Sequence, residues 1–411
     1  MNVRELKGLQ IADNQNIARH NGMWLVPSQA GAGLYKVNAE KQTCSCPDYD
    51  IRRAKCKHIF AVEVTIQRTH TATTKNGETT VTETVKVTHK QTYKQEWPAY
   101  NKAQTQEKRL FQYLLHQLCQ GVGSPAQQGA GRRFLPLEDV IFAMAFKVYS
   151  TVSGRRFMSD LRDAHAKGYL SQVPSYNSMF DYFNTEMLTD HLQMLIEESS
   201  LPLAAIENDF AVDSSGFSTS RFGQWMSEKY GDPVKTDRRL WLKAHLICGV
   251  KTNVVASVEI SKNYVGDSLF FKTLVDATAK NFTLKEVSAD KAYLSQKNLQ
   301  TVVDHNAMPY IAFKTNSVAE GKDKKKSQLW KNMYHYFAYN NDRFMSHYHK
   351  RSNVETTFHM IKAKFGTHLR SKTTRAQVNE ALLKVLCHNI CVLIQAMFEL
   401  NLKPKFWSVA A

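Results

Sequence analysis

Three acidic residues in the second half of the sequence are candidates for chemistry. Two predicted strands end on carboxylates: Asp213 follows the apolar run FAV and precedes the turn-prone SSG, and Asp290 follows EVSA and precedes KAY. Glu355 lies in the mixed-charge segment YHKRSNVETTFHMIK, residues 348–362. Taken singly, each is typical of a turn, a helix cap or a solvated face. Brought together, three carboxylates repel one another unless a divalent cation neutralises them.

The chemistry that such a cluster supports depends on its oxygen ligands. Oxygen ligands without a suitably spaced thiolate or imidazole favour Mg²⁺ or Mn²⁺. Two such ions about 3.5–4 Å apart would activate a water or hydroxyl and stabilise the leaving oxygen of an in-line phosphoryl displacement. Cations beside the glutamate, namely Arg351, Lys362 and Lys364, are suited to holding a phosphodiester backbone.

The bulk charge points to the same class of partner. The 411 residues include 54 Lys and Arg against 37 Asp and Glu, a formal net charge of +17. Such an excess favours a polyanion through phosphate neutralisation and counterion release, so nucleic acid is the expected partner. No basic amphipathic helix or lipidation signal supports a membrane surface instead.

The segment around Glu355 is expected to be a helix. At about 100° per residue, Tyr348, Arg351, Glu355 and Lys362 fall within about 60° of one another and share one face. Apolar residues occupy positions beside this face, as a helix packed on a core requires: Val354, Phe358, Ile361 and Phe365.

The elements before this segment predict a mixed sheet. From about residue 205, three strand patterns follow one another (AVDSSGF, WLKAHLICGV and VVASVEIS). A helix, the strand EVSAD, another helix and the strand PYIAF come next, so the pattern favours an α/β sheet with helices on its faces. Residues 101–200 are mainly helical in pattern and include the exposed-type pair Arg155 and Arg156.

A second constellation lies in CSCPDYDIRRAKCKH, residues 44–58. Cys44, Cys46, Cys56 and His58 follow the pattern C-x-C-x9-C-x-H, and these are ligand types that tetrahedral Zn²⁺ prefers. Two alternating runs before it predict a β-hairpin. Zinc would stabilise a segment too small to have its own core. The alternative is a pair of buried cysteines beside a surface histidine.

The second half of the sequence resembles the DDE transposases of bacterial insertion sequences. Tyr348, Arg351, Glu355 and Lys362 match the Y-x2-R-x3-E-x6-K motif of one group at every spacing. VDSSGF and SADKAYLS resemble the segments that carry that family's two aspartates, and WLKAH resembles the strand after the first.

This resemblance implies an RNase H-like fold and specific residue roles. Asp213, Asp290 and Glu355 would be the catalytic ligands of two Mg²⁺ or Mn²⁺ ions, and Tyr348, Arg351 and Lys362 would contact the phosphates of transposon ends. Lys364, Arg155 and Arg156 are predicted as further DNA contacts. The cysteine and histidine pattern resembles the SWIM zinc finger, a module that binds either DNA or protein.

The predicted organisation has five parts: a SWIM-type zinc finger at 1–66, a Thr-rich linker or β-ribbon at 67–98, a helical DNA-binding region at 99–204, an RNase H-like catalytic domain at 205–402 and a tail at 403–411. The apolar stretch VLCHNICVLIQAMFEL is broken by polar residues and is expected to be a buried helix. With no signal core at the start, we expect a cytoplasmic, DNA-associated bacterial protein that does not enter a membrane.

The expected function is that of an insertion-sequence transposase. It would bind double-stranded DNA at terminal inverted repeats, hydrolyse a phosphodiester to free a 3′-OH and transfer that end to target DNA, as a homodimer because two ends must be paired. One alternative is a catalytically inactive, transposase-derived DNA-binding protein, although all three carboxylates of the triad, Asp213, Asp290 and Glu355, are present. The other is an RNase H-like nuclease, which should lack the Tyr, Arg and Lys partners of the glutamate.

Overall fold

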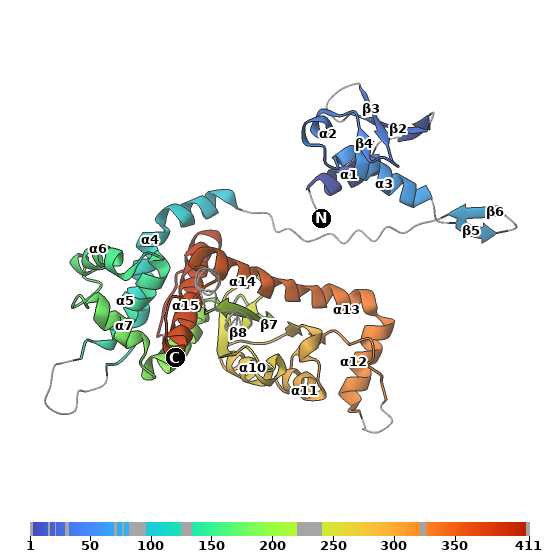
Figure 1. Ribbon diagram of the computed structural model, residues 1–411. Coiled ribbons are helices and arrows are strands. Elements are labelled where there is room, and N and C mark those ends of the chain that lie inside the picture. The colour runs from blue at the N-terminus through green and yellow to red at the C-terminus, as the bar shows by residue number, and fades with distance from the viewer. Residues whose placement is uncertain are drawn as a thin grey trace, which may run out of the picture. The chain divides into compact units, whose positions relative to one another are not determined.

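The computed structural model describes residues 3–14, 17–20, 22–28, 33–69, 72–75, 78–81, 96–124, 134–219, 241–320 and 326–407. The chain divides into two compact units, residues 1–94 and 95–411 (Figure 1). Each unit has its own hydrophobic core or cores, so each is described by itself.

The first unit is a small antiparallel sheet packed with helices. Its elements are α1 (Val3–Asn14), β1 (Ala18–His20), β2 (Met23–Pro27), β3 (Leu34–Asn38), β4 (Thr43–Cys44), α2 (Pro47–Arg52) and α3 (Lys57–Thr69). The strands follow the order β1-β2-β3-β4, and the predicted hairpin is confirmed by the pairing of Trp24 with Val37. The core includes Ile11, Val26 and Ile59 beside the three clustered cysteines.

The Thr-rich segment after the finger contains the predicted β-ribbon. Strands β5 (Ala72–Lys75) and β6 (Glu78–Val81) pair antiparallel, with Ala72 opposite Val81. Residues 70–71, 76–77 and 82–95 of the predicted linker lie outside the described residues. Helix α3 continues to Thr69, three residues beyond the predicted end of the finger.

The second unit begins with a helical part. It comprises α4 (Trp97–Cys119), α5 (Leu137–Ser150), α6 (Gly154–Ala166), α7 (Tyr176–Phe183), α8 (Met187–Ser200) and a 3₁₀ turn, η1 (Leu201–Leu203). The last helix of the chain, α15 (Thr374–Glu399), packs against α4, α5 and α8. This helix is long and apolar enough to cross a membrane. It is instead buried within this unit over most of its length, as the sequence predicts.

A five-stranded mixed sheet follows, in the order β11-β10-β7-β8-β9. The strands are β7 (Asp209–Ser218), β8 (Trp241–Gly249), β9 (Val255–Lys262), β10 (Glu286–Ala289) and β11 (Met308–Ile311). β7, β8 and β9 form an antiparallel meander, whereas β10 is parallel to both β7 and β11. The predicted α/β class, a mixed sheet flanked by helices and preceded by helices and a small β-hairpin module, is confirmed.

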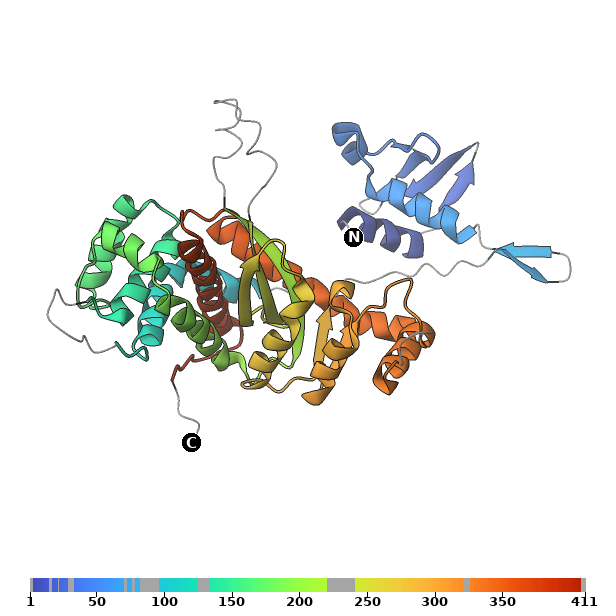
Figure 2. The same ribbon diagram turned by 60° about the horizontal axis from the view of Figure 1, so that its bottom comes forward.

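Helices cover both faces of this sheet (Figure 2). One core contains side chains of α10 (Phe271–Ala279), α11 (Gln296–Asp304), α12 (Gln328–Tyr339) and α13 (Asn341–Tyr348). The other contains those of α14 (Ser352–Phe365) and α15. Because successive strand residues point to opposite faces, Phe210 and Val212 enter the first core, while Ala211 and Phe217 enter the second.

The second of these cores also contains the interior of the helical part. The helical part and the sheet therefore share one hydrophobic core. The boundary predicted between residues 204 and 205 does not separate two cores. The apolar positions predicted on the motif helix lie in this core: Val354, Phe358, Ile361 and Phe365.

Candidate active site and zinc site

Asp213 and Asp290 occupy equivalent places on two neighbouring parallel strands. Pairing between β7 and β10 ends with Val212 opposite Ala289, and one aspartate follows each of these residues. Asp290 keeps an extended backbone, with φ −65° and ψ 156°. Adjacent strands lie about 4.8 Å apart, and residues in register point to the same face. The backbones of Asp213 and Asp290 are therefore neighbours, and their carboxylates leave the same face of the sheet.

The prediction that Asp213 ends its strand is wrong. β7 continues to Ser218 because it keeps pairing with the longer β8, so the sequence SSG is strand rather than turn. Asp213 shares its face of the sheet with Ala211 and Phe217, the face toward α14. The carboxylate is therefore aimed at the helix that carries Glu355.

The motif segment is not one uninterrupted α-helix as predicted. Tyr348 is the last residue of α13, Arg351 lies in a 3₁₀ turn, η4 (His349–Arg351), and Glu355 lies in the first turn of α14. The residues of the turn keep right-handed helical dihedrals, so the chain continues in a helical path. The tighter turn occurs where Lys350 and Arg351 both bind carboxylates of the sheet.

The side chains of the motif meet the two aspartates. Arg351 spans two carboxylates, with Nη1 3.3 Å from Asp213 Oδ2 and Nη2 2.8 Å from Glu355 Oε1. Tyr348 donates its hydroxyl to Asp290 Oδ1 at 3.5 Å. Arg351 is 22% exposed and Glu355 57% exposed, so the glutamate lies at the open side of the group. The structure thus brings the three predicted ligands and two of their predicted neighbours together.

The pKa of Asp213 reflects both its burial and the charges around it. Burial raises the pKa of the Asp213 carboxyl above its ordinary value, and the charges of Asp290 and Glu355 raise it further. The Ser214 amide, 2.8 Å from Asp213 Oδ1, and the Arg351 guanidinium oppose this rise. A nearby cation would stabilise the ionised form of a carboxyl group that is buried beside other acidic groups.

The donor set fits divalent cations that prefer oxygen. It contains carboxylates alone, as Mg²⁺ and Mn²⁺ sites commonly do. Among the described residues, only the cysteine and histidine group of the finger has three or more metal-type ligand atoms all within 4.8 Å of one another. The three carboxylates are spread more widely, with Arg351 between two of them, so ion binding requires this guanidinium to give up contacts.

The four finger residues form a compact, buried group. Cys44 ends β4, Cys46 caps α2, Cys56 precedes α3 and His58 lies in its first turn. His58 Nδ1 is 3.8 Å from Cys44 Sγ and 3.9 Å from Cys56 Sγ. With Zn–S of about 2.3 Å and Zn–N of about 2.0–2.1 Å, a tetrahedral site would have S···N separations of about 3.6 Å. The group fits zinc.

The alternative of a surface histidine beside two buried cysteines is wrong, because His58 is 3% exposed. Its Nε2 has no hydrogen-bond partner in the described part of the chain. Hydrogen bonding between Cys44 and Cys56 lowers the pKa of Cys56 and raises that of Cys44. One of these thiols is therefore readily available as thiolate, the form that binds a metal.

Comparison with known families agrees with both sites. Residues 205–390 match the family model of the transposase DDE domain, and residues 35–67 match that of the SWIM zinc finger. The chain carries a transposase DDE domain and a SWIM zinc finger. The first match contains all three carboxylates, and the second contains all four finger ligands. No solved structure matches the chain.

The two lysines predicted as DNA contacts in the DDE domain have protein partners. Lys362 Nζ donates to Ser215 Oγ at 2.7 Å and lies 5.5 Å from the Phe217 ring centroid. Lys364 forms an ion pair with Glu107 of α4. Lys364 thus connects the DDE domain to the helical part, and a DNA contact would require this ion pair to open.

The arginines predicted as DNA contacts lie on a different element. Arg155 and Arg156 are exposed in the first turn of α6, and the Arg155 guanidinium lies 5.3 Å from the ring centroid of Tyr176. The structure therefore does not bring them into the carboxylate group.

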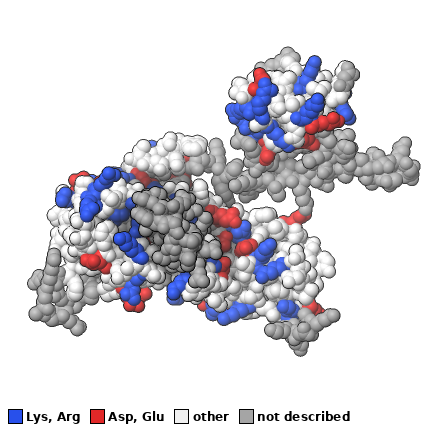
Figure 3. Space-filling view, in the orientation of Figure 1, with Lys and Arg blue, Asp and Glu red and all other residues white. Residues whose placement is uncertain are grey.

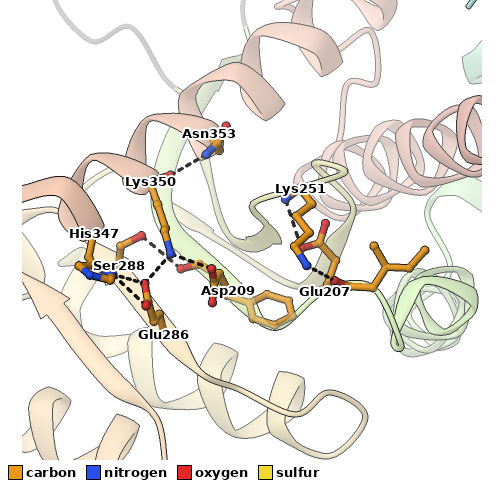
Figure 4. Close-up of polar contacts among 10 residues, drawn as sticks. Glu207, Asp209, Lys251, Glu286, Ser288, His347, Lys350 and Asn353 are labelled. Carbon is orange, nitrogen blue, oxygen red and sulfur yellow. Dashed lines mark hydrogen bonds and ion pairs between the residues drawn. The ribbon is translucent and has the colours of Figure 1, made fainter. Parts of the chain in front are cut away.

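The sequence reasoning missed an ion-pair cluster beside the triad (Figure 4). Lys350 Nζ lies 2.7 Å from Asp209 Oδ2 and 2.7 Å from Glu286 Oε2, and His347 Nδ1 lies 2.8 Å from Glu286 Oε1. Asp209 and Glu286 are opposite each other in the sheet. Asp209 precedes Asp213 by four residues, and Glu286 precedes Asp290 by four. This shared spacing could have indicated the cluster from the sequence. The cluster anchors η4, the turn that presents Arg351.

Replacing Lys350 with Met should destabilise the DDE domain. Two partly buried carboxylates would lose their shared cation, so the free energy of unfolding should fall by about 1–3 kcal/mol. Urea unfolding followed by circular dichroism measures this change. Lys350→Arg, which keeps the charge, should restore most of the stability. Equal stability of Lys350→Met and the wild type would show that the cluster does not anchor the turn.

Asp213 should make stability depend on pH. Its raised pKa means that the ionised carboxylate destabilises the folded state, so this penalty appears as pH rises above the ordinary carboxyl pKa. In Mg²⁺-free, zinc-saturated protein, Asp213→Asn should therefore raise the melting temperature near pH 7, and the difference should vanish in acid. Added Mg²⁺ should stabilise the wild type more than the variant. A variant less stable than the wild type at every pH would contradict this account.

Proposed function

We propose that this protein is an insertion-sequence transposase that binds the terminal inverted repeats of its element and cuts and joins DNA at those ends. The observation that carries the proposal is the gathering of Asp213, Asp290 and Glu355 on one face of the sheet, within a transposase DDE domain. We also propose that the predicted division at residues 66, 98, 204 and 402 describes functional parts of the chain.

Asp213, Asp290 and Glu355 would hold divalent ions, Mg²⁺ or Mn²⁺. When bound, the ions would activate a water or a 3′-hydroxyl and stabilise the leaving oxygen of the displaced strand. The residues of this chain supply position and charge. Asp213 and Asp290 are fixed by hydrogen bonds from the amides of the residues that follow them, and Glu355 approaches from α14.

The remaining motif residues would position the scissile phosphate. As ions neutralise the carboxylates, the Arg351 guanidinium would be released toward a phosphate oxygen, which it binds well because its planar fork makes two hydrogen bonds. Tyr348 lies beside Asp290 and would donate its hydroxyl to the same strand. Lys362 would add a cation further along α14.

Selection of the terminal repeats requires other parts of the chain, since phosphate contacts position DNA while base contacts specify sequence. Lys and Arg side chains gather over the helical part around α6, whereas acidic side chains are concentrated nearer β7 and α14 (Figure 3). We propose that the helical part, with Arg155 and Arg156, and the zinc finger bind the ends. Pairing of two ends would make the working form a dimer on DNA in the cytoplasm.

The deciding experiment is incubation of the zinc-loaded protein with DNA that carries the element ends, in Mg²⁺ or Mn²⁺. The proposal predicts nicking at the ends and release of a 3′-OH. Binding without nicking under either metal would favour an inactive DNA-binding derivative. Cleavage of DNA or RNA regardless of the end sequence would favour a nuclease.

A further inference from the structure

A cavity of about 680 Å³ lies in the second unit, away from the triad. It is lined by residues of α5, α7, the end of α14, the loop at residues 370–373 and the start of α15, and it is open to solvent. Phe365, which lines it, follows Glu355 by ten residues, or about 15 Å of helix. Its volume is within the range of about 300–1,000 Å³ typical of small-molecule sites.

Lys147 is an unpaired cation in the wall of this cavity. The side chain belongs to α5 and the residue is only 8% exposed. No described residue forms a hydrogen bond or ion pair with its ammonium group. Burial lowers the pKa of Lys147 and the positive charge of Arg370 lowers it further, while the negative charge of Glu380 partly opposes this shift. An ammonium on a largely buried side chain, with no hydrogen-bond partner among the described residues, is costly, and a bound anion would offset that cost.

The surroundings of Lys147 are positive as well. Four cationic residues line the cavity against two acidic ones: Lys147, Arg370, Lys372 and Lys384 against Asp181 and Glu380. Glu380 is already engaged, because it accepts hydrogen bonds from the Arg370 and Ser371 amides. Lys384 donates to the carbonyls of Gly366 and His368. Arg370 Nη1 donates to the Val152 carbonyl at 3.3 Å, which leaves its other guanidinium N–H groups. Lys147, Lys372 and these N–H groups of Arg370 therefore remain to bind an anion.

The first turn of α15 contributes to this positive field. Thr373 caps the helix by accepting from the Ala376 amide, and both residues line the cavity. A 26-residue helix presents partial positive charge and free amides at its N-terminus, which favours phosphate. The N-terminus of α15 therefore adds to the attraction for an anion that Lys147 provides independently.

Part of the cavity wall is aromatic. Phe180, Phe183 and Phe365 line it, and Phe180 remains 50% exposed. A Cβ atom at Gly154 would lie 2.8 Å from Phe180, so the start of α6 abuts this ring. Aromatic surface beside an anion site is suited to stacking a base whose phosphate is bound nearby.

We propose that this cavity binds one nucleotide unit, with its phosphate on Lys147 and Arg370 and its base against Phe180. The unit would come either from an unpaired position in a DNA strand or from a free nucleotide. The DNA source rests on the proposed transposase function, whereas the site itself does not.

Isothermal titration calorimetry of the full-length, zinc-loaded protein tests this site with dAMP, deoxyadenosine and inorganic phosphate. We expect dAMP to bind more tightly than either fragment. Lys147→Met should weaken dAMP at least tenfold without lowering the melting temperature, because it removes an unpaired buried charge. Phe180→Ala should weaken dAMP and deoxyadenosine but not phosphate. Lys102→Met, an exposed position on α4, should change nothing.

Two results would overturn the proposal: no dAMP binding at millimolar concentration, or equal binding by the wild type and a folded Lys147→Met. Competition identifies the source. Displacement of dAMP by a duplex with one bulged nucleotide, but not by a fully paired duplex, supports a DNA strand, and failure of both supports a free nucleotide. Glu355→Gln should bind dAMP normally, so loss of nicking and loss of this site are separable.

Discussion

Glu355→Gln is expected to abolish strand cleavage at transposon ends while leaving DNA binding intact. The substitution keeps the shape of the side chain and removes the charge that completes the carboxylate group. Loss of several kcal/mol of transition-state charge stabilisation corresponds to a fall in nicking rate of at least about a thousandfold. Nicking of labelled end DNA in Mg²⁺, with binding followed by gel shift, measures both effects. Asp213→Asn and Asp290→Asn should behave alike.

The matched control is Asp304→Asn. Asp304 is a carboxylate at the end of α11 that accepts a hydrogen bond from Gln300 in an exposed position. Its loss should leave cleavage within about twofold of the wild type, since isolated surface substitutions have small effects. If Glu355→Gln cut DNA as fast as this control, Glu355 would not belong to the catalytic group.

Removal of zinc should unfold the first unit and leave the second folded. Structural zinc contributes about 10–16 kcal/mol of apparent binding energy in finger peptides, more than a small core can replace. Cys56→Ala, or treatment with a chelator, should therefore abolish zinc binding and the finger's structure. Metal analysis and NMR of the finger signals would show this loss, while the melting transition of residues 95–411 should remain.

Cys391→Ser is the control for the zinc prediction. Cys391 lies on α15 in the second unit, outside the finger. Its substitution should leave one zinc per chain and an unchanged finger spectrum. A Cys56→Ala protein that retained both zinc and finger structure would show that the four residues are not the ligand set.

The sequence predicts most of the architecture because local patterns determine it. The hairpin, the order of strands after residue 205 and the buried last helix all follow from alternation, helical period and composition. The motif spacing also places Glu355 and Arg351 together. Asp213 was misplaced within its strand because the small residues after it resemble a turn, whereas pairing with β8 decides the outcome.

Contacts between distant segments could not be read from the sequence. Lys350 contacts Asp209 and Glu286, which lie 141 and 64 positions away in the sequence. Lys364 contacts Glu107, which lies 257 positions away. Such pairs depend on tertiary register rather than local spacing. The same holds for the cavity around Lys147, whose walls come from both the helical part and the end of the DDE domain.

The most direct test of the central claim is a crystal structure of the protein with DNA ends and Mn²⁺, using anomalous scattering to locate the metal. We expect ions bound by Asp213, Asp290 and Glu355, with the Arg351 guanidinium moved from the carboxylates to a DNA phosphate. Carboxylates more than about 10 Å apart, or manganese bound elsewhere, would contradict this expectation, because two ions about 4 Å apart could not then be bridged.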